Sequence, residues 1–462
     1  MKRGPGTSIS KAERRYSLRI LTYNAALWSA GNAVAAAPLL LYFASQRMYT
    51  ISFREIVLFA AAMIAMVRLF APRIIRRAGG VKRIAISTLA LAGVVLLLMP
   101  FVPRDSGLSD DFALLVDGGL FSLCLLLEAM GGVAIWTWIG EFAPSRVRGR
   151  YLGCRESLRL VALAPAVLAA GYIAASWRTD QRPAAEKLTD YSTLIAVGGL
   201  LLLAAAMTLV AARDIGRTEK GAGERIWREW FRPVKDPQFF RLLFFGVWMS
   251  FCVGLSLPAQ GYFPRYVLEL SPLTPYMFLA GATLGQALIS RSLGRSCDIV
   301  GSRTVVLISQ LIAAFVPFFF LVASPEQPWW IAAAALVLVA QVGVNLGLSN
   351  LMLKLAPPHE RSGYVAVFLA FTAAAFAFGR LIGDLLLEAL AFHRFQIAGR
   401  ELDDYDYLFY IGWITSLLGS VFLLGLKEPG ARGWIAVFQK PSTTPFPSAG
   451  SASTQPIRHP LD

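Results

Sequence analysis

Twelve apolar stretches of about 20 residues each limit the possible folds of this chain more than any other feature. A stretch of that length is long enough for a helix to cross a hydrocarbon core about 30 Å thick. The stretches are rich in Ala and Leu and lack the strict alternation of barrel strands, which favours helices. They begin near Ile20, Phe53, Ile84, Phe112, Gly153, Tyr191, Phe239, Leu273, Arg303, Trp329, Ser362 and Tyr407.

The composition also indicates an integral, multi-pass membrane protein. Hydrophobic residues make up 56% of the chain and charged residues 16%, and the mean hydropathy is +0.56. A soluble protein of 462 residues would have too little polar surface to cover such a core. The basic segment from Lys2 to Arg19 resembles the start of a signal peptide, but the apolar stretch after it is too long and lacks a small-x-small cleavage site. We therefore expect a retained first helix.

The distribution of basic residues predicts the orientation of the helices. Most of the 44 Lys and Arg residues fall in the loops on the N-terminal side of the membrane. The positive-inside rule then places both termini in the cytoplasm, with the helices in the cytoplasmic (inner) membrane. The net charge of +15 is explained by these short loops beside the lipid. No nucleic-acid partner is expected, because the chain lacks a soluble basic domain.

Several classes of chemistry lack their motifs. The four cysteines have no C-x-x-C spacing, and the three histidines lie in predicted loops or in the tail, so neither a metal site nor a disulfide is expected. There is no Walker loop and no G-x-S-x-G motif. We expect no cofactor, no catalytic residues and no ATP-driven transport within this chain.

An internal repeat divides the chain into two related halves. The segment Ala143-Pro144-x-x-x-Arg148-x-x-Tyr151 recurs 213 residues later as Ala356-Pro357-x-x-x-Arg361-x-x-Tyr364, and each copy lies between two apolar stretches. The predicted organisation is a basic cytoplasmic N-terminus (1–19), a six-helix bundle (20–213), a cytoplasmic linker (214–238), a second six-helix bundle (239–427) and a disordered tail (428–462). The linker is either a solvated connection or contains a short interfacial helix, because Trp and Arg alternate there.

A second motif lies between predicted helices 8 and 9, in the sequence Gly294-x-x-x-Asp298-x-x-Gly301-x-Arg303. Together with the twelve helices and the repeated loop, it resembles the major facilitator superfamily from about Leu18 to Lys427. The resemblance implies an all-α membrane protein with twelve transmembrane helices in two pseudo-symmetric six-helix bundles. It also implies that Asp298 helps to lock a cytoplasmic gate. The corresponding loop of the first half has Arg77 where the aspartate is expected, so that half needs another lock or uses the loop as a positive anchor.

The loop after predicted helix 4 has the sequence Glu141-x-Ala143-Pro144-x-x-x-Arg148-Gly149, which is similar to the gating loop of sugar porters. Other sugar-porter sequences are missing, so sugar is not supported as the substrate. A solvated turn with a positive anchor is the alternative for each charged residue. The predicted cytoplasmic gate comprises Glu141, Arg148, Arg155, Glu156, Gly294, Asp298, Gly301, Arg303 and Arg361.

Polar residues at mid-membrane depth are candidates for the transport site, because they are costly there. Glu128 is the clearest, since a carboxyl group in an apolar setting can be protonated at neutral pH. We predict that it carries the coupling proton or a counter-charge for the substrate. The repeat maps Glu128 onto Gln341, and Asn345 lies one turn later on the same helix face. These two amides either contact the solute or bond to a neighbouring helix.

Other intramembrane residues have two interpretations each. Arg159 either attracts an anionic substrate or forms an i, i+3 ion pair with Glu156, and Arg380 and Asp384 form either an outer structural or gate pair or a solute contact. The remaining candidates for the cavity lining are Asn24, Trp28, Asn32, Gln260 and Gln286.

We therefore predict a secondary active transporter that moves a small solute by alternating access, with protons as the expected coupling ion and a monomer in the bilayer as the expected state. A facilitative uniporter of the same fold is the alternative, because Glu128 is the one obvious acid at mid-membrane. A membrane enzyme or a channel-like scaffold is the alternative from another class. The two-half repeat with paired inside gates favours a carrier.

Overall fold

The computed structural model describes residues 10–45, 53–102, 110–182, 184–214, 226–390, 395–397 and 400–428. The predicted tail after residue 428, the first nine residues, and residues 215–225 of the predicted linker lie outside this range. Each of the twelve predicted apolar stretches forms a helix or a pair of consecutive helices.

The first half contains seven α-helices and one short 3-10 helix, η1, which continues α3. Their bounds are α1 Lys11–Ser45, α2 Phe53–Arg77, α3 Val81–Leu98, η1 Met99–Phe101, α4 Asp110–Phe142, α5 Arg148–Thr179, α6 Ala184–Asp190 and α7 Ser192–Ala211.

The linker helix and the second half follow. The second half contains one antiparallel hairpin, β1–β2. The bounds are α8 Ile226–Lys235, α9 Pro237–Tyr266, α10 Leu273–Ile299, α11 Ser302–Ala313, α12 Val316–Val322, α13 Trp330–Leu338, α14 Gln341–Leu355, α15 Arg361–Leu390, β1 Phe395–Ile397, β2 Arg400–Leu402 and α16 Asp404–Phe422.

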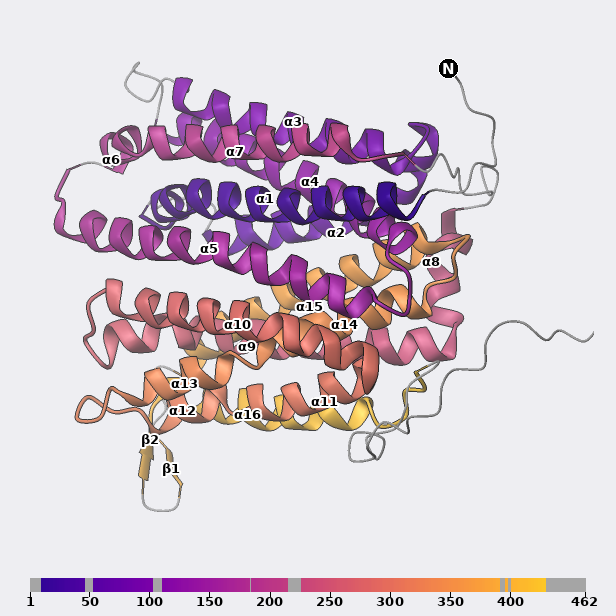
Figure 1. The fold of residues 1–462 in the computed structure, drawn as a ribbon. Coiled ribbons are helices and arrows are strands. Elements are labelled where there is room, and N and C mark those ends of the chain that lie inside the picture. Colours follow the sequence, from indigo (N-terminus) through magenta and orange to yellow (C-terminus); the bar gives the residue numbers. More distant parts are fainter. Residues whose placement is uncertain are drawn as a thin grey trace, which may run out of the picture.

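Two bundles of helices lie side by side, the first above the second in the view of Figure 1. They meet mainly where α5 packs against α10 and where α2 packs against α15. Among the described residues, nine helical segments are long and apolar enough to cross a membrane; α2, α10 and α16 fall outside that set. The predicted all-α membrane fold in two halves is confirmed, whereas a count of twelve spans stays a prediction.

The first helix begins before its apolar part. It starts at Lys11, within the predicted basic N-terminus, because Ser10 and Glu13 cap it reciprocally. The Ser10 amide donates to the Glu13 carboxylate at 3.1 Å, and the Glu13 amide donates to the Ser10 hydroxyl at 3.1 Å. This pattern is the capping box. The helix therefore extends about two turns beyond the apolar stretch that begins near Ile20.

A helix is present in the predicted linker, and it contacts both bundles. The indole of Trp230 in α8 donates to the carbonyl of Leu69 in α2 at 3.0 Å, and its ring packs on Phe70. Arg232 forms an ion pair with Glu360, the residue before α15. The described part of α8 is thus attached to α2 and to the start of α15.

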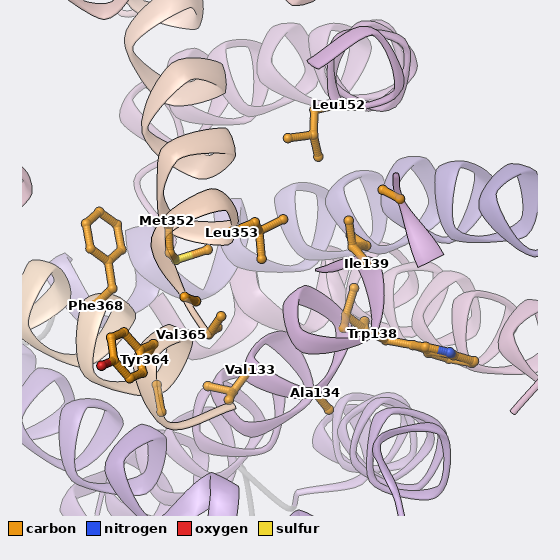
Figure 2. Close-up of a cluster of buried hydrophobic side chains, with 14 of the residues drawn as sticks. Val133, Ala134, Trp138, Ile139, Leu152, Met352, Leu353, Tyr364, Val365 and Phe368 are labelled. Carbon is orange, nitrogen blue, oxygen red and sulfur yellow. The ribbon is translucent and has the colours of Figure 1, made fainter. Parts of the chain in front are cut away.

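The largest buried hydrophobic cluster crosses from one bundle to the other. It joins Trp138 and Ile139 of α4 with Leu353 of α14 and Val365 of α15, and Figure 2 shows these side chains together. The cluster also includes residues next to the predicted cytoplasmic loops. The two other buried clusters of the described chain each belong to a single bundle. The apolar seal between the bundles therefore lies at the end with the gate motifs.

Glycines allow the backbones of α5 and α10 to approach closely at this end. A Cβ atom added to Gly149 would lie 2.5 Å from the carbonyl oxygen of Gly294, and one added to Gly153 would meet the backbone at Ser290 and Gly294. Because the obstructing atoms are backbone, they cannot move aside as a flexible side chain can. The contact requires glycine on both helices.

Replacing Gly294 by Leu should therefore push α5 and α10 apart. Overpacking of this kind costs about 1–3 kcal/mol, which corresponds to an increase of about fivefold or more in the population of the separated state. We expect Cys297, which is 1% exposed, to react with N-ethylmaleimide faster by at least that factor, as measured by peptide mass spectrometry.

Gly281 on the same helix provides the matched control. A Cβ atom there meets nothing within 4 Å, so Gly281→Leu should label Cys297 at the wild-type rate. Equal labelling of Cys297 in both variants would contradict a seal that depends on the glycine contact.

Candidate functional site

Glu128 of α4 lies at the centre of a polar cluster in the first bundle. Its side chain is 6% exposed. Trp28 of α1 donates from its indole nitrogen to Glu128 Oε2 at 2.8 Å, and the Asn32 amide donates to the same oxygen. The Cys124 thiol, one turn earlier in α4, lies 3.4 Å from Glu128 Oε1. Helices 1 and 4 thus combine three neutral donors around one carboxyl group.

The positions of these residues follow from helical spacing. Trp28 and Asn32 are four residues apart and share a face of α1, and Gly132 of α4 leaves room for the Trp28 ring, which lies 3.5 Å from the position of an added Cβ. Asn24 is fully buried and donates to the Ala205 carbonyl of α7 at 2.9 Å. Its amide therefore joins α1 to α7 and makes no contact with the Glu128 cluster.

A second charged group lies on α5, beside the same part of α1. Arg159 binds Glu156 through two hydrogen bonds of 2.9 and 2.6 Å, which is the i, i+3 pair that the spacing suggested. Its third nitrogen donates to the Ser29 hydroxyl of α1 at 3.3 Å. Arg155 is 5% exposed, and its guanidinium lies 5.1 Å from the centre of the Trp136 ring of α4.

In the second bundle, the helix that carries Gln341 and Asn345 is broken at mid-length. The break separates α13 from α14, and Gln341 is the first residue of α14. Gln286 of α10 donates to the Leu338 carbonyl at the end of α13 at 3.0 Å, which satisfies a carbonyl that the break leaves free. This contact accounts for the Gln286 amide without a solute.

Gln341 and Asn345 share the face of α14 that is opposite to its contact with α11. Gly343 and Gly347 of α14 pack against Ser309 and Val306 of α11. Asn345 is exposed and Gln341 is half-buried, and no described residue forms a hydrogen bond with either side chain. In the described chain, the two amides therefore form no hydrogen bond to a neighbouring helix. Gln260 of α9 is likewise half-buried and without a hydrogen bond in the described chain.

The outer pair on α15 is loose. Arg380 Nε and Asp384 Oδ2 are 4.0 Å apart, and their side chains are 34% and 22% exposed. The spacing of four residues brings the two charges together without a short contact.

Asp298 links the two bundles at the predicted cytoplasmic gate. Its two carboxylate oxygens accept hydrogen bonds from the backbone amides of Gly149, at 2.7 Å, and Arg150, at 2.8 Å. These are the first free amides of α5, so an acid from the second bundle caps a helix of the first. Gly301 has a φ of 113°, a left-handed conformation that glycine favours.

The two arginines of the repeated segment are both buried and lie near one another. Arg148 donates to the Ala143 carbonyl at 3.1 and 3.2 Å, which ties the loop between α4 and α5 to itself. The Arg361 side chain of the second bundle packs on Gly140 at the end of α4, where it leaves no space for a Cβ atom. Glu141 lies beside this contact in the sequence and makes polar interactions of its own.

Glu428 is part of the gate region and was missed by the sequence analysis. Its carboxylate is 1% exposed, accepts the backbone amides of Ser302 and Arg303 at 3.0 and 2.8 Å, and pairs with Lys354 at 2.6 Å. Arg303 also donates to the Leu424 carbonyl at 2.6 Å. Glu428, which follows α16, therefore joins the start of α11 to the end of α14. An acid directly after the last apolar stretch was the available signal.

The first bundle repeats part of this arrangement. Lys82, at the start of α3, donates to the Val210 carbonyl near the end of α7 at 2.8 Å. Arg303 makes the equivalent contact at the start of α11. Arg77, which stands where the aspartate is expected, is exposed. Arg68, in the middle of α2, was not among the residues predicted from the sequence. It donates to the Leu369 carbonyl of α15 at 2.7 Å and so joins the bundles.

Comparisons with known proteins agree with this fold. The sequence model of the Major Facilitator Superfamily matches residues 268–458. The outward-conformation crystal structure of FucP, a transporter of that superfamily, has a TM-score of 0.65 at 14% identity and covers 90% of this chain and 100% of its own. The proton:xylose symporter XylE has a TM-score of 0.62 at 15% identity, covering 90% and 96%.

A human protein is also similar. The human organic anion transporter MFSD10 has a TM-score of 0.62 at 12% identity, covering 89% of this chain and 99% of its own. No curated protein sequence matches the chain significantly. The predicted resemblance to major facilitator superfamily transporters is confirmed, and identities this low extend the likeness to the fold alone.

The Glu428 contact generates a stability prediction. Glu428→Gln removes the charge that faces Lys354 and leaves one acceptor oxygen for the two backbone amides. Because breaking a buried ion pair leaves the other charge uncompensated, we expect the free energy of unfolding to fall by about 3 kcal/mol. Thermal unfolding of the purified protein would measure this change.

A double-mutant cycle separates the pair from the cap. Lys354→Met should cost less in the Glu428→Gln background than in the wild type, with a coupling energy above about 1 kcal/mol. Glu326→Gln is the control, because this acid is exposed and should change stability by less than about 0.5 kcal/mol. Additive effects of the two gate substitutions would show that the charges act independently.

Proposed function

Because the chain is a membrane protein with the fold of major facilitator superfamily transporters, we propose that it moves a small solute by alternating access, coupled to protons. In this proposal, Glu128 carries the coupling proton. Gln341 and Asn345 contact the solute, and Glu141, Arg148, Asp298 and Arg361 take part in the cytoplasmic gate. The protein acts without a catalytic step, as a monomer in the cytoplasmic (inner) membrane with both termini inside.

The setting of Glu128 is the observation that carries the proposal. The carboxyl group is nearly buried, and no Lys or Arg of the described chain lies within ion-pair distance of it. Trp28 and Asn32 both donate to Oε2, which leaves Oε1, beside the weak Cys124 donor, to hold a proton. Burial without a cation favours the neutral acid, whereas neutral donors on Oε2 keep the anion accessible. A group in this balance can bind and release a proton during a cycle.

The contacts between the bundles support alternating access. The buried cluster that crosses the bundles lies at the gate end, and the clusters at the other end stay within one bundle. Asp298 holds α5 through two hydrogen bonds that break when α5 and α10 separate. When such contacts break, two rigid bundles can rock about a central site.

The solute can be identified with purified protein. Sugars, organic acids, amino acids and drug-like cations are tested for their ability to raise the melting temperature. A solute that binds at the central site should stabilise the wild type but not Gln341→Ala, because the α14 amide is a predicted contact. Stabilisation that is equal in both proteins would contradict the role of Gln341.

Glu128→Gln tests the coupling. With the solute so identified, an inward-directed proton gradient should drive accumulation in wild-type proteoliposomes but not in Glu128→Gln vesicles, since the amide cannot bind the transported proton. Exchange of labelled for unlabelled solute without a gradient should persist, because it needs no net proton movement. Glu326→Gln should accumulate solute like the wild type.

Three other outcomes have definite meanings. Accumulation in Glu128→Gln at the wild-type level would rule out Glu128 as the coupling site. Exchange without gradient-driven accumulation in the wild type would indicate the uniporter. Conductance without any solute exchange would favour a channel-like protein.

A further inference from the structure

The charges on α5 are not balanced in the described structure. Arg155 and Arg159 lie one turn apart on α5, and Glu156 is the one acid that contacts them; it pairs with Arg159 through two hydrogen bonds. Arg155 is 95% buried but has no carboxylate within ion-pair distance in the described chain, and its Nε has no hydrogen-bond partner there. Its neighbour is the face of the Trp136 ring. One positive charge thus remains uncompensated.

The direction of these side chains follows from the surface of α5. Between Cys154 and Tyr172, the exposed residues of the helix form one stripe, which is the lipid-facing side: Cys154, Val161, Pro165, Leu168, Ala169 and Tyr172. At about 100° per residue, Glu156 and Arg159 lie more than about 120° away from the centre of that stripe. The exposed parts of their side chains, 13% and 30%, therefore face the interior of the protein.

Neighbouring helices show which part of the interior this is. Gly149 and Gly153 of α5 pack on α10, so that side of the helix is filled. The guanidinium of Arg159 touches Ser29 of α1, and that of Arg155 stacks on Trp136 of α4. Helices 1 and 4 are the elements that also hold Glu128. The arginines thus lie beside the two helices that hold Glu128.

We propose that Arg155 and Arg159 bind an anionic group of the transported solute, a carboxylate or another oxyanion. This inference rests on the proposed transport function and names its substrate class. Guanidinium groups bind oxyanions through charge-assisted hydrogen bonds, often in pairs. An unpaired buried charge is costly, and a solute anion would compensate it. Glu156 holds Arg159 in the absence of solute, and the anion competes with it.

The competition with Glu156 provides a test, because replacing an arginine should weaken anion binding and replacing Glu156 should strengthen it. Binding is measured by thermal shift on purified protein in nanodiscs with benzoate, succinate and phenylphosphonate as probes. Benzamide and succinamide serve as uncharged partners of similar shape. We expect at least one anion to bind the wild type and its uncharged partner to bind at least tenfold more weakly.

The variants separate a binding role from a structural one. Arg155→Gln and Arg159→Gln should raise the dissociation constant of the anion about tenfold or more. Arg155→Lys, which keeps the charge but not the planar fork, should have a smaller effect. Glu156→Gln should lower the dissociation constant severalfold, because Arg159 is released. Arg178→Gln is the control, since this arginine is exposed at the far end of α5 and should bind as the wild type does.

Definite results would overturn the proposal. The first is that no anion binds to the wild type, and the second is that anions and amides bind equally well. The third is that anions bind more weakly to Glu156→Gln, although size-exclusion chromatography shows that this variant is folded. Binding at equilibrium requires no proton gradient, so these results are independent of the Glu128 transport experiment. If the transport experiment rules out Glu128 as the coupling site, the anion-binding proposal is unaffected. If no anion binds, the proposed role of Glu128 is unaffected.

Discussion

The approach of α5 to α10 is the contact on which the arrangement of the two bundles depends. It requires glycine at 149, 153 and 294, because the backbone of the opposite helix occupies the space of a side chain. The same approach brings Asp298 to the first free amides of α5. Steric fit and electrostatic capping are thus one interaction, since the hydrogen bonds form only where the glycines permit the contact.

The second contact between bundles, of α2 with α15, is built differently. Arg77 cannot cap the start of α15 as Asp298 caps α5, because a helix N-terminus favours an anion. Arg68 instead donates to a carbonyl of α15, while the linker helix α8 reaches α2 through Trp230 and pairs with Glu360 through Arg232. The two halves therefore share the order of their long helices but differ in the contacts at the predicted gates.

The helices were predictable because length and hydropathy are local properties of the sequence. All twelve apolar stretches are helical, and the Asp298 motif was identified from its spacing. Contacts between distant segments were less accessible. Glu428 directly follows the last apolar stretch, and its contacts are with Ser302 and Lys354, which are far from it in the sequence. Arg68 was a visible intramembrane charge, but its partner is a backbone carbonyl, which has no sequence signature.

The site residues were predictable as a set of candidates but not as a network. The repeat related Glu128 to Gln341, and position within an apolar stretch selected Trp28 and Asn32. The same rules also selected Asn24 and Gln286, whose amides bond to backbone carbonyls of α7 and α13. The direction in which each side chain faces decides between the two outcomes, and the sequence alone does not fix that direction.

One turn of α1 connects the two charged groups of the first bundle. Trp28 donates to Glu128, and the next residue, Ser29, accepts a hydrogen bond from Arg159. Adjacent residues of a helix point about 100° apart, so α1 contacts α4 on one side and α5 on the other. A movement of this turn changes both contacts together. In the proposed transport cycle, this turn would link protonation of Glu128 to charge pairing at Arg159 through two neighbouring side chains.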